Sequence, residues 1–237
     1  MNRVGRGGMM SNLTDVVKNL LIINVLVYIA VNVVQVGAAY VPSQFWNLID
    51  FLGFHYFDSD KFRPFQIVSS MFVHGGTMHI LFNMMSLFFL GPMLEQRLGA
   101  KNFLSFYFIA GIGAVLFTML VSAIRIYLMT GGVFADPALV NSTASLYSMY
   151  NAPTVGASGA ISGIFIAFAM FFPNLEMYII PIPFPVKAKY LVMVMIAISL
   201  FLGIANFSGD NVAHFTHLGG ILFGFLMILY WRKTGKV

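Results

Sequence analysis

The sequence predicts an all-α membrane protein, a bundle of six transmembrane helices with both ends of the chain on the cytoplasmic side. Hydrophobic residues make up 59% of the 237 residues and charged residues only 9%, and the mean hydropathy is +0.86. A soluble domain carries about 25% charged residues, so little of this chain is water-soluble. Six apolar stretches also span or nearly span a bilayer, which takes roughly 17–25 residues.

The six predicted helices follow one another along almost the whole chain. The first stretch lacks a clear small-residue cleavage site and is long enough to span, so we expect a transmembrane helix and not a cleaved leader. We place the helices near Leu20–Val36, Thr77–Leu94, Phe103–Ile124, Gly156–Phe172, Tyr190–Phe207 and Val212–Trp231.

The segments between these helices differ in character. Asp50–Pro64 is a polar loop with aromatic residues, and Phe65–Val73 is apolar but short, which predicts an interfacial element. Tyr127–Pro153 is too polar to span and too long for a tight turn, and long connections of this kind are often functional. Prolines punctuate the link between the fourth and fifth helices, at Pro173, Pro181, Pro183 and Pro185.

Lysine and arginine residues predict the orientation, because cytoplasmic loops carry an excess of them. With the N-terminus inside, ten lie inside (Arg3, Arg6, Lys18, Arg97, Lys101, Lys187, Lys189, Arg232, Lys233 and Lys236) and three outside (Lys61, Arg63 and Arg125). The net charge of +5 therefore reflects helix ends and not nucleic-acid binding. We expect a cytoplasmic N-terminal segment (1–19), a membrane domain (20–231) and a cytoplasmic tail (232–237), in a multi-pass protein of the bacterial inner membrane.

Several chemistries find no support. The absence of cysteine excludes disulfides, thiolate metal sites and a cysteine nucleophile. No His-Glu-x-x-His run is present for zinc, and all eight acidic residues are predicted in loops or at helix ends, away from membrane depth. We expect no metal and no cofactor, although haem ligation by His79 with His217 or His214 stays open. A solute channel lacks the internal repeats or charged pathway that would indicate one.

Polar residues at one membrane depth indicate a site. Ser158 lies 14 residues before Phe172 and His217 lies 14 before Trp231, which puts both about 21 Å from the inner helix ends. His79 is about 18 Å from the inner end of its helix, and Asn83 follows one turn later on the same face. All four side chains can share one layer, where polar groups are costly and usually functional.

Each of these residues also has a structural interpretation. Ser158 stands in a run of small residues that typically serves helix packing, and His217 could be a buried histidine bonded to a carbonyl. His79 and Asn83 could bridge helices by hydrogen bonds. His55, His74 and His214 lie near the outer interface, where we expect solvated or structural roles. The joint placement at one depth favours a nucleophile and base, Ser158 and His217.

The same residues stand in a pattern that resembles the rhomboid intramembrane serine proteases. That family carries two histidines and an asparagine in its second helix, Gly-x-Ser-Gly in its fourth, and His with Gly at +3 and +7 in its sixth. The matching residues are His74, His79 and Asn83, then Gly156-Ala157-Ser158-Gly159, then His217, Gly220 and Gly224, with Glu95-Gln96-Arg97 as the Glu-x-Arg that follows helix two. The resemblance covers about Leu20 to Trp231 and implies a bundle of the rhomboid type.

The resemblance implies a serine endopeptidase that cuts single-pass or polytopic membrane proteins in or next to a transmembrane segment. Ser158 and His217 would form the catalytic dyad, while His79, Asn83 and Gly156 would serve the oxyanion and substrate. Gly159, Gly220 and Gly224 would let helices pack closely. The expected partners are such substrates and the lipid bilayer, with no nucleic acid. The alternative is a catalytically inactive rhomboid-like binding or chaperone factor, a class that loses the Ser or the His.

Two positions depart from the family pattern. The family often has Trp-Arg in the first outer loop, where this chain has Phe65-Gln66, so we expect other contacts to anchor that loop. The family also often has an aromatic residue four positions after the serine, packed on the catalytic imidazole. That position is Ser162 here, which leaves open what orients the His217 ring.

Overall fold

The structure is a computed structural model that describes residues 13–38, 47–178, 184–205 and 211–237, and it is mostly helical. Each predicted apolar stretch, within the described residues, corresponds to one helix, although the fourth helix begins at Ser158 and not at Gly156. These helices are α1 (Asp15–Ala38), α4 (Thr77–Leu98), α5 (Ala100–Thr130), α8 (Ser158–Phe171), α9 (Ala188–Ala205) and α10 (Asn211–Lys233). Four of them, α1, α4, α5 and α10, are long and apolar enough to cross a membrane, while the apolar helices α8 and α9 are shorter.

The shorter elements connect these helices. They are α2 (Leu48–Leu52), α3 (Gln66–Ser69), a 3₁₀ turn at Ser70–Phe72, α6 (Pro137–Ser142) and α7 (Ala144–Asn151). Two short antiparallel strands, β1 (Glu176–Met177) and β2 (Val186–Lys187), pair with Glu176 opposite Lys187.

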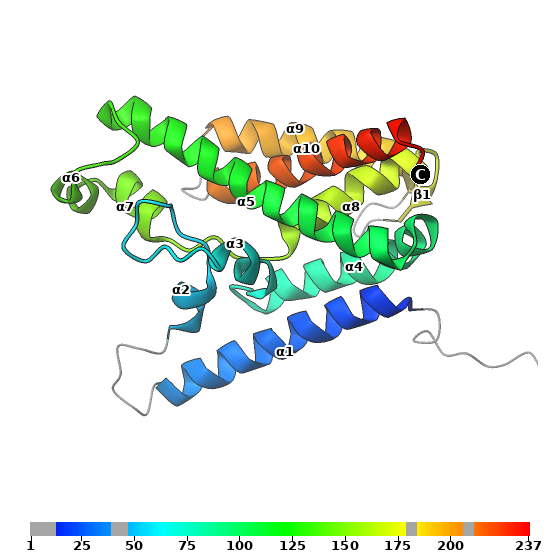
Figure 1. The fold of residues 1–237 in the computed structure, drawn as a ribbon, viewed down its shortest axis with the longest axis horizontal. Coiled ribbons are helices and arrows are strands. Elements are labelled where there is room, and N and C mark those ends of the chain that lie inside the picture. Colours follow the sequence, from blue (N-terminus) through cyan, green and yellow to red (C-terminus); the bar gives the residue numbers. More distant parts are fainter. Residues whose placement is uncertain (1–12, 39–46, 179–183, 206–210) are drawn as a thin grey trace, which may run out of the picture.

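Helix α8 lies at the centre of the packing, and most of its residues are buried. It packs against α5 and α10, while α9 packs on α10 and α1 packs on α4 (Figure 1). The core around it is built from large buried side chains such as Phe103, Phe106, Phe168 and Trp231. The outward faces stay apolar, as Leu26, Phe82 and Phe201 show, which suits a lipid surround.

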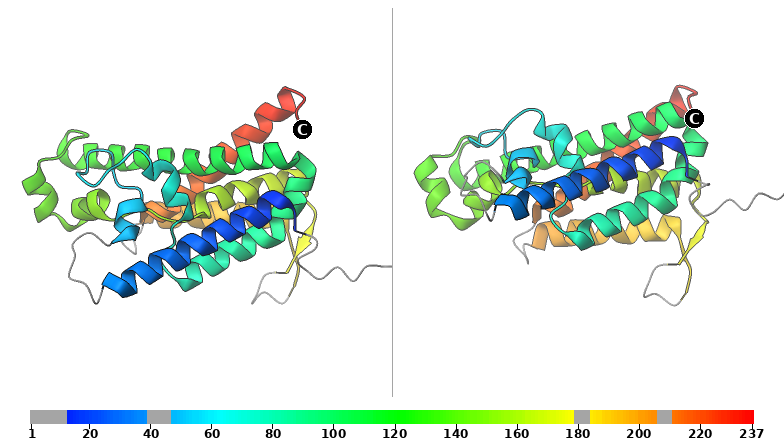
Figure 2. Two further views of the ribbon diagram at one scale, coloured as in Figure 1. Left: turned by 60° about the horizontal axis from the view of Figure 1, so that its bottom comes forward. Right: turned by 90° about the horizontal axis from the view of Figure 1, so that it is seen from below.

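Two ends of the bundle are distinct (Figure 1, Figure 2). Helices α2, α3, α6 and α7 gather at one end, and the C-terminus and β1 lie at the other, together with the beginning of α1 and the ends of α4 and α10. Helix α8 begins partway along the bundle and runs to the second end. Its 14 residues span about 21 Å, so Ser158 lies inside the layer of helices and not at its rim.

The segment Tyr127–Pro153, expected as one long connection, is largely helical. Helix α5 continues to Thr130, and α6 and α7 follow. The extra turn of α5 is stabilised because Ile126 packs with buried residues of the outer loops, namely Tyr56, Val140, Leu146, Met149 and Tyr150. The polar loop expected at Asp50–Pro64 likewise begins inside α2.

Glu95 lies at a helix end, as expected of the acidic residues, but it is buried there. The second helix does not stop at Leu94 but continues through Leu98, so Glu95 lies in its last turn and is buried. Its carboxylate accepts hydrogen bonds from the Thr14 hydroxyl and from the backbone N–H groups of Val16 and Val17. A carboxylate suits these N–H groups at the start of α1, because they lack partners within the helix.

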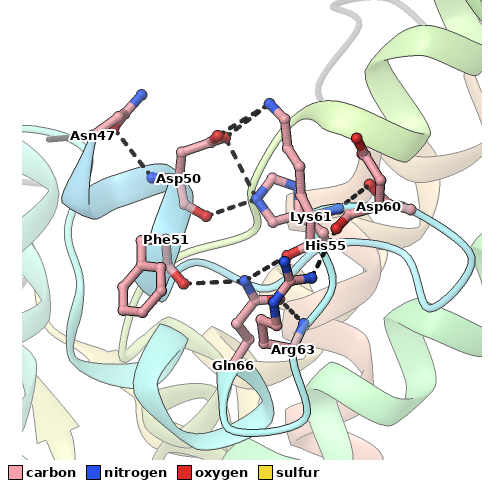
Figure 3. A network of polar contacts seen from close by, with 9 residues as sticks. Asn47, Asp50, Phe51, His55, Asp60, Lys61, Arg63 and Gln66 are labelled. Carbon is pink, nitrogen blue, oxygen red and sulfur yellow. Dashed lines mark hydrogen bonds and ion pairs between the residues drawn. The ribbon is translucent and has the colours of Figure 1, made fainter. Parts of the chain in front are cut away.

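Gln66 anchors the first outer loop in place of the expected Trp-Arg pair. Its fully buried amide donates to the carbonyls of Phe51 and Lys61 at 3.0 Å and accepts from the N–H of Arg63 at 3.0 Å (Figure 3). Beside it, His55 contacts the Asp50 carbonyl at 2.8 Å and its carboxylate at 3.4 Å. The loop is therefore held by its own polar contacts.

Candidate active site

The four residues predicted for chemistry line one cavity of about 570 Å³. Ser158 comes from the first turn of α8, His217 from α10, and His79 and Asn83 from α4. Three helices that are distant in sequence therefore contribute to one space. The shared depth expected from the spacing corresponds to a shared cavity in the structure.

The chain turns sharply just before Ser158, at Gly156. This glycine has φ +125°, a conformation that residues with a side chain rarely adopt, and its N–H donates to the Ser70 carbonyl at 2.9 Å. A Cβ there would lie 2.7 Å from His79 Nε2 and 3.6 Å from Ser158 Oγ. The space beside the serine therefore exists because residue 156 has no side chain, and the His79 imidazole borders it.

Helix α8 also presents its N-terminus at this point. Ser158 is the first residue of the helix, and the opening N–H groups of any helix lack partners within it. The partial positive charge of a helix N-terminus favours an anion nearby. The position of Ser158 therefore combines a hydroxyl with a local electrostatic preference for negative charge.

Asn83 brings an amide to the same cavity. Its side chain is buried, and Nδ2 has no hydrogen-bond partner among the described residues. A buried donor left unpaired costs free energy, so native proteins rarely keep one without a reason. This amide is available to an oxygen that enters the cavity.

His74 packs behind His79. The two ring centroids are 5.1 Å apart in an edge-to-face arrangement, and His74 is buried in the loop before α4. Burial, and secondly the neighbouring His79, lowers the pKa of His74 from 6.5 to about 4. We expected solvated or structural roles for His55, His74 and His214. A solvated role is wrong for His55 and His74, because both are buried. His214 is half-buried.

A pair of threonines joins the helices beside His217. Thr118 on α5 donates to the Ala114 carbonyl at 2.9 Å, and its hydroxyl lies 2.8 Å from the hydroxyl of Thr216. Both threonines also line the cavity. Thr216 precedes His217 directly, so this contact fixes the turn of α10 that carries the histidine. Sequence patterns did not indicate Thr118, since its partner is 98 residues away.

Glycines bring α10 against α8 just below the cavity. A Cβ on Gly220 would collide with the carbonyl group of Gly159, and one on Gly224 would lie 2.8 Å from the Cα of Gly163. The backbones of the two helices are therefore in direct contact. Ser158 and His217 lie next to this contact, on the side of the cavity. Ser158 directly precedes Gly159, and His217 lies three residues before Gly220.

Outer loops cover the cavity. Phe54, Met149 and Thr154 line it, and Phe54 and Thr154 exchange backbone hydrogen bonds at 2.9 and 2.8 Å. The Tyr150 hydroxyl donates to Asp58 at 3.1 Å and accepts from the N–H of Ala135 at 2.9 Å. Burial raises the pKa of Tyr150 above its ordinary value, which favours the protonated hydroxyl further. The sequence did not indicate these residues as part of the site, because only the fold brings them there.

Within the described parts of the chain, no three His, Asp or Glu side chains cluster as metal ligands would. The available chemistry is that of a hydroxyl, two imidazoles and an amide around one cavity.

Comparison with known proteins shows the family to which the chain belongs. The chain is 26% identical over 125 residues to the Inactive RHOMBOID-like protein 8 of Arabidopsis thaliana, an alignment that covers 52% of this chain and 34% of that protein. The chain thus spans about a third of the relative's length. Residues 61–234, well over half of the chain, match the Rhomboid domain. With the helices and the cavity in place, this match shows that the chain is an integral, multi-pass membrane protein of the rhomboid family.

Proposed function

We propose that the chain is an intramembrane serine endopeptidase that hydrolyses peptide bonds in or next to transmembrane segments of other membrane proteins. The observation that carries this proposal is the common cavity of Ser158 and His217, with the unpaired Asn83 amide beside them. Nucleophile, base and oxyanion donor are the groups that acyl transfer requires, and three separate helices supply them. No metal or cofactor takes part in the proposed reaction.

In the proposed reaction, His217 accepts the proton of Ser158 while Oγ attacks the scissile carbonyl carbon. The resulting oxyanion is stabilised by the Asn83 amide, the His79 imidazole and the Ser158 backbone N–H at the start of α8. Protonated His217 then gives its proton to the leaving amine as the C–N bond breaks. Water attacks the remaining ester, and its hydrolysis restores the serine. Gly156 leaves the space through which the substrate backbone approaches.

A second candidate is a catalytically inactive rhomboid-like factor that binds membrane proteins. The name of the Arabidopsis thaliana relative, an inactive rhomboid-like protein, favours it. Against it stand Ser158 and His217, both present and both bordering the cavity.

We also propose the arrangement in the membrane. The chain would cross six times, with α8 and α9 as the two shorter spans, a cytoplasmic segment at 1–19, a membrane domain at 20–231 and a cytoplasmic tail at 232–237. The support is the distribution of charge, because the described lysines and arginines at the C-terminal end of the bundle outnumber those at the opposite end. A bacterial inner membrane is the proposed location.

A fluorophosphonate probe tests the enzyme directly. The probe should label Ser158 in the purified protein, and Ser158→Ala should abolish both labelling and cleavage of a transmembrane substrate. Ser162→Ala is the matched control, because Ser162 is one turn further along α8, buried, and not among the residues that line the cavity. It should label normally. Cleavage that persists in Ser158→Ala would refute the serine mechanism.

The base is tested in parallel. His217→Ala should abolish turnover, while His214→Ala, one turn earlier on α10 and not among the cavity-lining residues, should retain most of it. The reverse result would assign the base to His214. An inactive, unlabelled wild-type protein that binds transmembrane segments would instead support the second candidate.

A further inference from the structure

Two arginine side chains lie over the same aromatic ring. They are at the end of the bundle opposite the loops that cover the cavity. The guanidinium carbon of Arg97 lies 5.3 Å from the centroid of the Phe171 ring, and that of Arg232 lies 5.4 Å from the same centroid. The residues come from the ends of α4, α8 and α10. Stacking on a ring holds a guanidinium in place without occupying its N–H donors.

These two positive charges have no acidic partner among the described residues. The ion pairs found there join Lys18 to Asp15, and His55 and Lys61 to Asp50. Glu95, two residues before Arg97, is engaged with the start of α1. Arg232 donates one hydrogen bond to the Met170 carbonyl at 2.9 Å. The side chains of both arginines are exposed.

Further positive charge lies at the same end of the bundle. Lys233 follows Arg232 directly, Lys101 opens the next helix after Arg97, and Lys189 stacks on Tyr190 at 5.2 Å at the start of α9. By the proposed topology this end lies in the cytoplasmic interface, where headgroups of anionic lipids are found. Exposed arginines with free donors at that depth are within reach of lipid phosphates.

We propose that Arg97, Arg232 and Phe171 form a binding site for the phosphate of an anionic phospholipid in the inner leaflet. Each guanidinium offers a planar pair of N–H donors to phosphate oxygens, and Phe171 holds both in position. The site would fasten the ends of α4, α8 and α10 to the lipid surface. It does not depend on proteolysis, so its test is independent of the proposed activity.

Native mass spectrometry of the delipidated full chain tests the site. Phosphatidylglycerol should bind more tightly than phosphatidylcholine with the same acyl chains. The double variant Arg97→Gln/Arg232→Gln should weaken phosphatidylglycerol binding on the order of 10-fold or more, since each hydrogen bond lost to a charged phosphate contributes about a tenfold factor or more. The matched control, Lys101→Gln/Lys236→Gln, removes the same charge from the same end and should weaken binding far less.

Two further variants separate the site from diffuse charge and from misfolding. Phe171→Leu keeps every charge but removes the ring, and Arg97→Lys/Arg232→Lys keeps the charge but removes the planar donors; both should weaken phosphatidylglycerol binding severalfold. Equal loss in the lysine control, or no preference for phosphatidylglycerol in the wild type, would overturn the site. Inorganic phosphate in excess should not displace the lipid; if it does, the site is one for free phosphate and the lipid proposal fails.

Discussion

Asn83 places an amide at the cavity without a partner of its own among the described residues. A buried donor that loses its partner costs about 1–3 kcal/mol, so this amide favours an oxygen that enters the cavity. At the scale of the residue, Asn83 is therefore placed to bind a substrate oxygen and not to join two helices.

Substitution of Asn83 tests this role. Asn83→Ala should lower turnover by about 10–10³-fold, because one oxyanion donor is lost. It should leave fluorophosphonate labelling of Ser158 detectable and should not lower the thermal unfolding temperature in detergent. Ser86→Ala on the same helix removes a hydroxyl that donates to the Phe82 carbonyl and should leave turnover unchanged. Unchanged turnover in Asn83→Ala would return Asn83 to a helix-bridging role.

His74 should make stability depend on pH. Its pKa is about 4 in the folded protein and near 6.5 unfolded, so the folded protein keeps this imidazole neutral where the unfolded chain protonates it. The stabilisation is complete above pH 6.5 and is lost as the pH falls to 4, by at most about 3 kcal/mol. Thermal unfolding in detergent at about pH 7 and about pH 4.5 should therefore differ less in His74→Asn than in the wild type. Equal differences would contradict the assignment.

The sequence predicted the positions of some functional residues but not the partners of others. Ser158, His217, His79 and Asn83 could be placed together because helical rise converts sequence spacing into depth. Gln66 and Glu95 could not be assigned, since a glutamine or glutamate gives no sign of which backbone groups it will meet. Their partners, up to 81 residues away for Glu95, become neighbours only after helices pack.

Among the elements, the contact of α8 with α10 matters most for the site. Backbone meets backbone at Gly159 and Gly220, and no flexible side chain is available there to move aside. Any added atom must separate the helices, and the same helices carry Ser158 and His217. The precision of the site is therefore set by a contact that touches no substrate.

Gly220→Ala should consequently impair both folding and activity. The new Cβ would collide with the Gly159 carbonyl, and overpacking of this kind costs about 1–3 kcal/mol or more. Thermal unfolding and cleavage should both show the loss. Gly37→Ala in α1 is the matched control, because a Cβ there meets nothing within 4 Å and alanine favours a helix. A fully active Gly220→Ala protein would show that the helices can separate without harm.

The helices and strands differ in how clearly the sequence predicts them. Long apolar runs predicted all the major helices, although α5 and α4 extend beyond the apolar runs, to Thr130 and Leu98. Helices α6 and α7 and the β1–β2 pairing were missed, because short mixed segments carry no clear period. Their structure depends on packing, as Tyr150 and Ile126 show in the outer cluster.

For the molecule as a whole, the distribution of charge is the main guide to orientation. A fluorescent protein fused after Val237 should fluoresce, and alkaline phosphatase at the same place should be inactive, because the tail is expected inside. Phosphatase fused after Ala135, in the loop that follows α5, should be active. Phosphatase activity at the C-terminus, without activity after Ala135, would refute the proposed cytoplasmic tail.

The hydrogen bonds between Glu95 and the beginning of α1 carry a consequence for biogenesis. Helix α1 is synthesised before α4, and the carboxylate that accepts hydrogen bonds from Val16 and Val17 comes 78 to 79 residues later. Until α4 has been made to its last turn, these N–H groups at the start of α1 have no carboxylate to bind and are left to water. The docking of α1 through Glu95 therefore waits for the translation of α4.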